Sequence, residues 1–317
     1  MAKILVTGAA GFIGSHTTDF LLAEGHAVVG VDNFRSGHPE NLAGARKSAN
    51  FRFQELDVAQ DGALAGVVAA ERPTAIIHLA ALVSVQESVA NPGLNYLLNL
   101  HATHLVAEAA RVYEVTRVVF ASSAAIYGDA TELPIRENSE KRPVSPYGAA
   151  KLASEDLLFG HAATYGFTAR CQRYFNVFGP RQDPASPYSG VISIFAKRFR
   201  DGEAVTIFGD GRQTRDFISV HDVARANALA ATRPGLASGA VNICTGRPTS
   251  LLELASYFSE QFSSAPCPRH AAARPGDIVH SLGSPAAAER ELGFTARTGM
   301  SEALAGLSAA QAPVFSS

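Results

Sequence analysis

Cysteine is scarce in this chain of 317 residues, and what the sequence lacks narrows the possible functions. Cys171, Cys244 and Cys267 are an odd number of cysteines at scattered positions, without the spacing of metal ligands. We therefore expect no disulfide framework, no bound metal and a location in the reducing cytoplasm. No apolar run approaches the roughly 20 residues that a membrane span requires, so a membrane protein is not expected. A formal net charge of −2 provides no basic surface for nucleic acid.

The apolar residues, 47% of the chain, fall into short runs separated by segments with helical spacing. Runs rich in Val and Ile begin at Lys3, Ala27, Ala75 and Arg117 and mostly lack polar–apolar alternation. Strands buried on both faces of a parallel sheet have this pattern. The helical segment after the first run ends at Gly25, a residue type typical of helix C-termini. The alternation predicts an α/β protein with a Rossmann-type doubly wound parallel sheet.

The length of the chain allows about two domains. Beyond about residue 172 the pattern loosens into turns rich in Pro and Gly, with shorter elements between them. We therefore predict a first domain at 1–172 that contains the parallel sheet, and a smaller α/β domain at 173–317 that binds the substrate. A segment near 216–245 is expected to return to the first domain.

The stretch TGAAGFIGSH places Gly8, Gly11 and Gly14 between the first predicted strand and the first predicted helix. Glycines at these positions allow a tight turn and bring the backbone close to a pyrophosphate, which the helix N-terminus attracts. Asp32 closes the second predicted strand, where a carboxylate would accept the ribose hydroxyls and repel a 2′-phosphate. The pattern favours NAD over NADP. Arg35 could neutralise such a phosphate, but we interpret it as a solvated loop charge.

The stretch SPYGAAK places Tyr147 and Lys151 four residues apart, on one face of a predicted helix. A free phenol has a pKa near 10, which is too high for a base at neutral pH. A nearby ammonium and the positive charge of an oxidised nicotinamide both favour the phenolate. With the serine-rich strand end at Ser123, Tyr147 could take a proton from a sugar hydroxyl while the carbon gives up hydride.

These motifs together resemble the extended short-chain dehydrogenase/reductase family, and within it the nucleotide-sugar 4-epimerases of the UDP-glucose/UDP-N-acetylglucosamine type. The resemblance rests on the motifs TGAAGFIG, VDNFRSG, LDV, HLAA, SSAAIYG, SPYGAAK, RYFNVFGPRQDP, TRDF and RPGD, which follow one another from the first strand to about residue 281. It implies NAD as cofactor, a UDP-sugar as substrate and a homodimer formed by the helices around 95–113 and 146–165.

The resemblance also implies a role for each matching residue. Ser123, Tyr147 and Lys151 would be catalytic: Ser123 would bond the C4 oxygen, Tyr147 would exchange its proton, and Lys151 would hold the nicotinamide ribose and depress the tyrosine pKa. The cofactor would contact Gly8, Gly11, Phe12, Ile13, Gly14, Asp32, Asn33, Ser36, Asp57, Val58, Leu79, Ala80, Ala81, Asn99, Ser122, Tyr147, Lys151 and Tyr174. The substrate would contact Ser123, Tyr147, Asn176, Phe208, Arg215, Arg274, Asp277 and Ser281.

Within the substrate set, the resemblance assigns each part of the nucleotide to particular residues. Asn176, Arg215 and Arg274 would bind the diphosphate, Asp277 the nucleotide ribose, and Phe208 would lie near the base. Ser281 stands where a bulky Tyr can crowd the C2 substituent in relatives restricted to glucose and galactose. A small Ser leaves room for an N-acetyl group, so some activity on UDP-N-acetylglucosamine is predicted.

Two alanines, Ala124 and Ala125, follow Ser123 in the stretch FASSAAIYGD. Related 4,6-dehydratases carry an acidic pair at these positions, which eliminates water across C5 and C6. Without a carboxyl acid and base, nothing obvious could protonate the C6 hydroxyl or remove the C5 proton. The alanines therefore favour oxidation at C4, rotation of the keto sugar and return of the hydride to its other face.

Three alternatives remain open from the sequence. The enzyme could epimerise UDP-glucuronate at C4, or it could be a 4-keto reductase that consumes exchangeable cofactor. A non-catalytic protein that senses NAD(H) could use the same fold, although such proteins tend to lose the catalytic tyrosine, and Tyr147 is present here.

Overall fold

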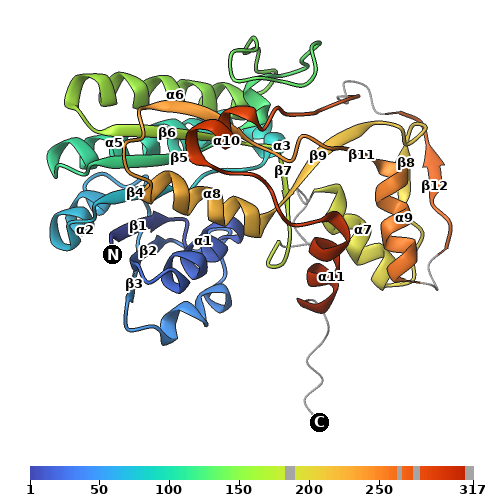
Figure 1. Ribbon diagram of the computed structural model, residues 1–317, viewed down its shortest axis with the longest axis horizontal. Helices are drawn as coiled ribbons and strands as arrows, with labels where there is room; N and C mark the ends of the chain where they lie inside the picture. Colours follow the sequence, from blue (N-terminus) through green and yellow to red (C-terminus); the bar gives the residue numbers. More distant parts are fainter. Residues whose placement is uncertain (183–189, 263–265, 274–278, 311–317) are drawn as a thin grey trace.

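Seven parallel strands form the central sheet of the protein in the computed structural model, which describes residues 1–182, 190–262, 266–273 and 279–310 (Figure 1). The order across the sheet is β10-β6-β5-β4-β1-β2-β3. The strands are β1 (Lys3–Thr7), β2 (Ala27–Asp32), β3 (Phe51–Glu55), β4 (Ala75–His78), β5 (Arg117–Ser123), β6 (Thr168–Tyr174) and β10 (Gly239–Ile243). All four strands predicted from apolar runs begin at the expected residues, and the doubly wound fold is confirmed.

Helices cover both faces of this sheet, which explains why its strands lack alternation. One face is covered by α1 (Phe12–Ala23), α8 (Val220–Thr232) and α10 (Ala286–Leu292), and the other by α2 (Ala63–Glu71), α5 (Ala102–Val112) and α6 (Pro146–Tyr165). In β1 the side chains of Ile4 and Val6 join the first apolar cluster, whereas Leu5 joins the second. An apolar side chain at any position of such a strand is removed from water, which stabilises the fold.

Short helical elements connect these layers. They are η1 (Pro39–Leu42), η2 (Ala45–Lys47), α3 (Val85–Ala90), α4 (Pro92–Asn95), the π-helical turn η3 (Tyr96–His101) and η4 (Ala124–Ile126). None of the helices in the described ranges is long and apolar enough to cross a membrane. The three cysteines are free thiols.

The C-terminal part contains two smaller sheets beside the large one. β9 (Thr214–Ser219) pairs with β7 (Asn176–Phe178) and β11 (Pro248–Ser250), and β8 (Thr206–Phe208) pairs with β12 (Arg269–Ala271). The helices α7 (Val191–Arg200), α9 (Leu251–Gln261) and α11 (Met300–Ala310) pack around a separate apolar cluster there. Between β9 and β11 the chain passes through α8 and β10, both of which belong to the large sheet and its cover.

The strand order reverses between β1 and β4. The sheet grows outward from β1 through β2 to β3 on one side, and from β4 through β5 to β6 on the other. At such a switch point the connections leave in opposite directions, and a crevice forms beyond the carboxyl ends of the strands. A ligand site is therefore expected at this edge.

Candidate active site

The glycine turn lies at the switch point, between β1 and α1. Gly8 has φ +70°, and a Cβ there would lie 2.8 Å from the backbone nitrogen of Ala80. A Cβ on Gly14 would overlap the carbonyl oxygen of Gly8. Helix α1 then begins at Phe12, with Gly11 as an N-cap that provides no side-chain hydrogen bond. A backbone turn free of side chains at a helix N-terminus suits a pyrophosphate, so this part of the site fits a dinucleotide.

Asp32 ends β2 next to this turn and is only 7% exposed. Its carboxylate accepts hydrogen bonds from the backbone N–H groups of Ala10 (2.9 Å) and Phe34 (2.8 Å). Burial raises the pKa of Asp32, and these backbone hydrogen bonds oppose that shift. Arg35 is not simply a solvated loop charge, because its guanidinium forms an ion pair with Glu87 at 2.5 Å.

The predicted contacts after β4 are arranged around Thr7, a residue that the sequence analysis missed. The Thr7 hydroxyl accepts hydrogen bonds from the backbone N–H groups of Leu79 (3.1 Å) and Ala80 (3.2 Å). These bonds fix the loop after β4 against the end of β1. Beyond β3, Asp57 accepts a hydrogen bond from the Ala59 N–H at 2.9 Å.

The remaining predicted cofactor residues follow the same edge of the sheet. Val58 is buried beside Asp57, and Ala81 continues the loop after β4. Phe12 and Ile13 open α1, whereas Asn33 and Ser36 belong to the loop after β2. The carboxyl ends of the parallel strands thus gather residues that are far apart in the chain.

Three predicted cofactor residues have their polar groups engaged by the protein. The Asn99 amide lies on the π-helical turn, accepts from the Leu82 N–H at 3.1 Å and donates to the Leu82 carbonyl at 3.0 Å. The Ser122 hydroxyl donates to Glu155, and the Tyr174 hydroxyl donates to Asn227 at 2.6 Å. In this structure these groups hold neighbouring segments together at the carboxyl edge of the sheet.

The three predicted catalytic residues are brought together by α6 and the end of β5. Helix α6 is capped by Ser145, whose hydroxyl accepts the Gly148 N–H at 3.1 Å. A Cβ on Gly148 would lie 2.6 Å from the Ala125 carbonyl oxygen, so glycine lets the helix approach this loop closely. That approach places Tyr147 within hydrogen-bonding reach of Ser123.

Lys151 lies one helical turn beyond Tyr147 and is fully enclosed. Its ammonium group donates to the Ala121 carbonyl at 2.8 Å and lies 5.8 Å from the centre of the Tyr147 ring. Burial lowers the pKa of Lys151 to about 7, although the negative charge of Glu155 opposes the shift. The lysine is thus held beside the tyrosine ring.

Burial raises the pKa of the Tyr147 phenol, and the hydrogen bond with Ser123 lowers it only in part. The expectation that Lys151 depresses this pKa is not met by the protein groups alone. The other cation expected to favour the phenolate of Tyr147 is the positively charged nicotinamide of an oxidised cofactor.

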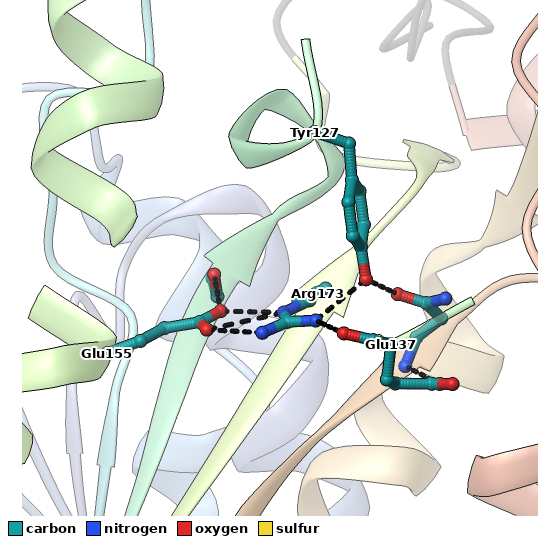
Figure 2. Close-up of polar contacts among 6 residues, drawn as sticks. Tyr127, Glu137, Glu155 and Arg173 are labelled. Carbon is teal, nitrogen blue, oxygen red and sulfur yellow. Dashed lines mark hydrogen bonds and ion pairs between the residues drawn. The ribbon is translucent and has the colours of Figure 1, made fainter. Parts of the chain in front are cut away.

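A buried ion pair near the predicted catalytic residues was not expected from the sequence. Arg173 on β6 donates to the Glu155 carboxylate of α6 at 2.7 Å and 3.0 Å, and the two side chains are 3% and 1% exposed (Figure 2). Burial lowers the pKa of Arg173, but the hydrogen bonds and charge of Glu155 more than reverse this effect, so the guanidinium stays charged.

The same pair also contacts the segment after Ala125 and the end of β5. Arg173 donates to the Tyr127 hydroxyl and to the Glu137 carbonyl, each at 2.8 Å, which holds the segment after Ala125 (Figure 2). Glu155 accepts the hydrogen bond of the Ser122 hydroxyl, next to Ser123, which is predicted to be catalytic. The pair therefore joins α6, β5, β6 and the loop after β5 into one support for the predicted catalytic residues.

Apart from Ser123 and Tyr147, the predicted substrate residues in the described ranges lie beyond β6, three of them around one cavity. Asn176, Phe208 and Arg215 line this cavity, whose volume is about 560 Å³. Gln213 and Arg198 line it as well and were not predicted. Arg274 and Asp277 lie outside the described residues. A cavity of this size with cationic groups suits an anionic ligand of nucleotide-sugar size.

Two further features fix the strand that carries Arg215. The neighbouring Asp216 is fully buried and accepts the Thr245 N–H at 2.8 Å, the Gly246 N–H at 2.9 Å and the Gly283 N–H at 3.3 Å. Burial raises the pKa of Asp216, and these hydrogen bonds oppose the shift. Ser281 donates its backbone N–H to the Thr214 carbonyl at 3.1 Å, so it lies beside the same strand.

The glycine turn, the acidic end of β2 and the Ser123–Tyr147–Lys151 group share one edge of the sheet. Together they define a dinucleotide-dependent enzyme of the short-chain dehydrogenase/reductase type. In the described ranges, no group of three or more His, Cys, Asp or Glu residues is placed to hold a metal ion.

Comparison with known proteins agrees with this class. The model of the NAD dependent epimerase/dehydratase family matches residues 4–244. A UDP-glucose 4-epimerase of Mycolicibacterium smegmatis is 38% identical over 304 residues, which is 96% of each chain. The chain belongs to the NAD dependent epimerase/dehydratase family.

Two solved structures are similar over nearly the whole chain. The UDP-glucose 4-epimerase of Thermus thermophilus in complex with NAD has a TM-score of 0.87 and 36% identity, covering 97% of this chain and 98% of that chain. The UDP-N-acetylglucosamine 4-epimerase of Methanobrevibacter ruminantium, in complex with UDP-N-acetylmuramic acid, has a TM-score of 0.92 and 34% identity, covering 98% and 97%.

Proposed function

We infer that the protein is an NAD-dependent isomerase that interconverts the C4 epimers of a UDP-hexose, UDP-glucose and UDP-galactose, through a transient 4-keto sugar. The observation that carries this inference is that Tyr147, Ser123 and Lys151 lie together at the sheet edge that also carries the glycine turn. The family match and the names of the relatives support the same reaction.

The cofactor would lie along the carboxyl edge of the sheet, with its pyrophosphate at the glycine turn and its adenosine ribose near Asp32. When bound, NAD supplies the acceptor that takes hydride from C4 and later returns it. Asp32 leaves no favourable place for a 2′-phosphate, which supports NAD over NADP.

The protein groups would manage the proton and the orientation of the sugar. Ser123 holds the C4 oxygen, and Tyr147 takes the C4 hydroxyl proton as the ketone forms. Tyr147 then returns a proton to the C4 oxygen when hydride arrives on the other face of the rotated sugar. Lys151 would orient the tyrosine ring and hold the nicotinamide ribose.

The turn after β5 supports epimerisation rather than dehydration. Ala124 and Ala125 form the start of η4, directly after Ser123. Neither methyl group can protonate a C6 hydroxyl or remove a C5 proton. The ketone formed at C4 therefore has no elimination route through these positions.

The test of this function uses purified protein without added cofactor, incubated in turn with UDP-glucose, UDP-N-acetylglucosamine and UDP-glucuronate. We expect the C4 epimer of UDP-glucose to form, because an epimerase keeps the NAD that it reduces and reoxidises. In deuterated solvent the inverted C4 should remain unlabelled, since its hydrogen never mixes with water. Dependence on stoichiometric NAD(P)H would identify a 4-keto reductase, and product from UDP-glucuronate alone would identify the uronate epimerase.

Ser281 would give the sugar pocket room for an N-acetyl group. We predict that Ser281→Tyr lowers turnover of UDP-N-acetylgalactosamine more than turnover of UDP-galactose, because the larger ring crowds only the bulkier C2 substituent. Steady-state kinetics of both substrates, before and after the substitution, measure this difference. An equal response of the two substrates would show that Ser281 does not face the C2 position.

The homodimer implied by the resemblance would use η3, α5 and α6. Large apolar side chains are exposed there: Tyr96 (57%), Leu97 (41%), Val112 (51%) and Tyr165 (52%). Burying such a surface against a second copy would remove it from water. Sedimentation equilibrium should give the mass of a dimer, and a monomer mass at micromolar concentration would refute the proposal.

A further inference from the structure

The short helix α3 (Val85–Ala90) follows β4 and is fixed directly to the catalytic helix. The Ser88 hydroxyl accepts the backbone N–H of Tyr147 at 3.2 Å. At the start of α3, the Ser84 hydroxyl accepts the Glu87 N–H at 2.9 Å. One side of α3 is therefore anchored at the residue that exchanges the proton, and Glu87 extends from its first turn.

The Glu87 carboxylate meets a cation from the other side of the switch point. It forms an ion pair with Arg35 at 2.5 Å, and the two side chains are 23% and 43% exposed. The loop that carries Arg35 is held by its own polar side chains. Asn33 accepts the Arg35 N–H at 3.1 Å, and Asp32 accepts the Phe34 N–H at 2.8 Å.

The strand order determines what this ion pair crosses. Arg35 follows β2 and Glu87 follows β4, whereas β1 lies between these two strands. Adjacent strands are about 4.8 Å apart, so β2 and β4 are separated by roughly 10 Å. The ion pair therefore joins the segments that follow the two strands on either side of β1, whose end carries the glycine turn at Gly8.

We propose that Arg35 and Glu87 form a clasp over the bound dinucleotide and slow its release. The proposal rests on the NAD dependence inferred above. An epimerase must return the hydride it removed, and loss of reduced cofactor before that return would strand the keto sugar. An ion pair across the glycine turn would close the cofactor crevice at its adenosine half, while the Ser88–Tyr147 bond ties the clasp to the catalytic half.

The test measures cofactor release from the loaded enzyme. Protein loaded with radiolabelled NAD is chased with excess unlabelled NAD, and the label that remains bound is followed in time. Arg35→Gln and Glu87→Gln should each accelerate release about two- to fivefold, the effect of losing a partly exposed ion pair. The charge-swapped variant Arg35→Glu/Glu87→Arg should restore slow release. In about 1 M salt the difference between variants and wild type should shrink.

Arg52→Gln is the matched control, because Arg52 forms an ion pair with Glu71 at 3.0 Å at the opposite, amino edge of the sheet. It should leave release unchanged. Unchanged release in both clasp variants would overturn the proposal, as would acceleration by Arg35→Gln alone, which would mean that Arg35 contacts the cofactor directly without Glu87. Wild-type protein that binds NAD but forms no epimer would instead refute the proposed function.

Discussion

Tyr147→Phe is expected to lower kcat for the interconversion of UDP-glucose and UDP-galactose by about 10²- to 10⁴-fold, the usual contribution of a positioned acid–base group. The substitution removes one oxygen atom from a half-buried ring that lies beside Lys151 and Ser123. The ring can remain in place, so KM should change far less than kcat. Steady-state kinetics with UDP-galactose provide the measurement.

The control for this experiment is Tyr165→Phe, at the far end of the same helix, where the ring is 52% exposed. It should leave kcat unchanged. Retained NAD binding in Tyr147→Phe would show that the cofactor site is intact. Full activity in Tyr147→Phe would contradict the proposed mechanism, and a cellular function that survives without turnover would favour the NAD(H)-sensing alternative.

Arg173→Met is expected to destabilise the folded protein by about 3 to 5 kcal/mol, because it leaves the buried charge of Glu155 without its partner. Glu155 is 1% exposed and cannot be solvated by rotation into water. The measurement is the free energy of unfolding from urea titration. Arg173→Met/Glu155→Leu should recover part of the loss, since the double variant removes both charges.

An exposed ion pair supplies the comparison. Arg142 pairs with Glu140 at 2.6 Å, and the two side chains are 76% and 67% exposed. Arg142→Met should cost at most about 1 kcal/mol. Equal effects of Arg173→Met and Arg142→Met would mean that the buried pair contributes no more than a surface contact.

The parts of the site that the sequence predicts are those encoded locally. Four strands follow from apolar runs, because a strand buried on both faces leaves no alternation. Gly8 and Gly14 stand three residues on either side of Gly11, a spacing that indicates a tight turn before a helix. Tyr147 and Lys151 are four residues apart, which places them on one face of a helix.

Other parts depend on contacts between distant segments, which spacing does not report. Glu155 and Arg173 are 18 residues apart, and only the packing of α6 on β6 brings them together. Arg35 and Glu87 are 52 residues apart and meet because β2 and β4 flank β1. For the same reason the sequence alone predicts a solvated Arg35, although in the folded protein Arg35 pairs with the Glu87 carboxylate.

The direction of the Tyr147 pKa shift could not be predicted from the sequence either. The spacing of Tyr147 and Lys151 indicates that a cation lies near, but it does not indicate how deeply both side chains are buried. Burial acts on both groups in the direction of the neutral form. The balance between charge and desolvation is a property of the packed structure.

Asp216 has a consequence for the whole molecule. Its single carboxylate is shared by the segment after β10, which belongs to the large sheet, and by Gly283, while its own strand belongs to the small sheet behind the cavity. Separating the two sheets would leave a buried carboxylate and several backbone donors without partners at the same moment. The two predicted domains should therefore unfold in one cooperative step, and neither should be stable as an isolated fragment.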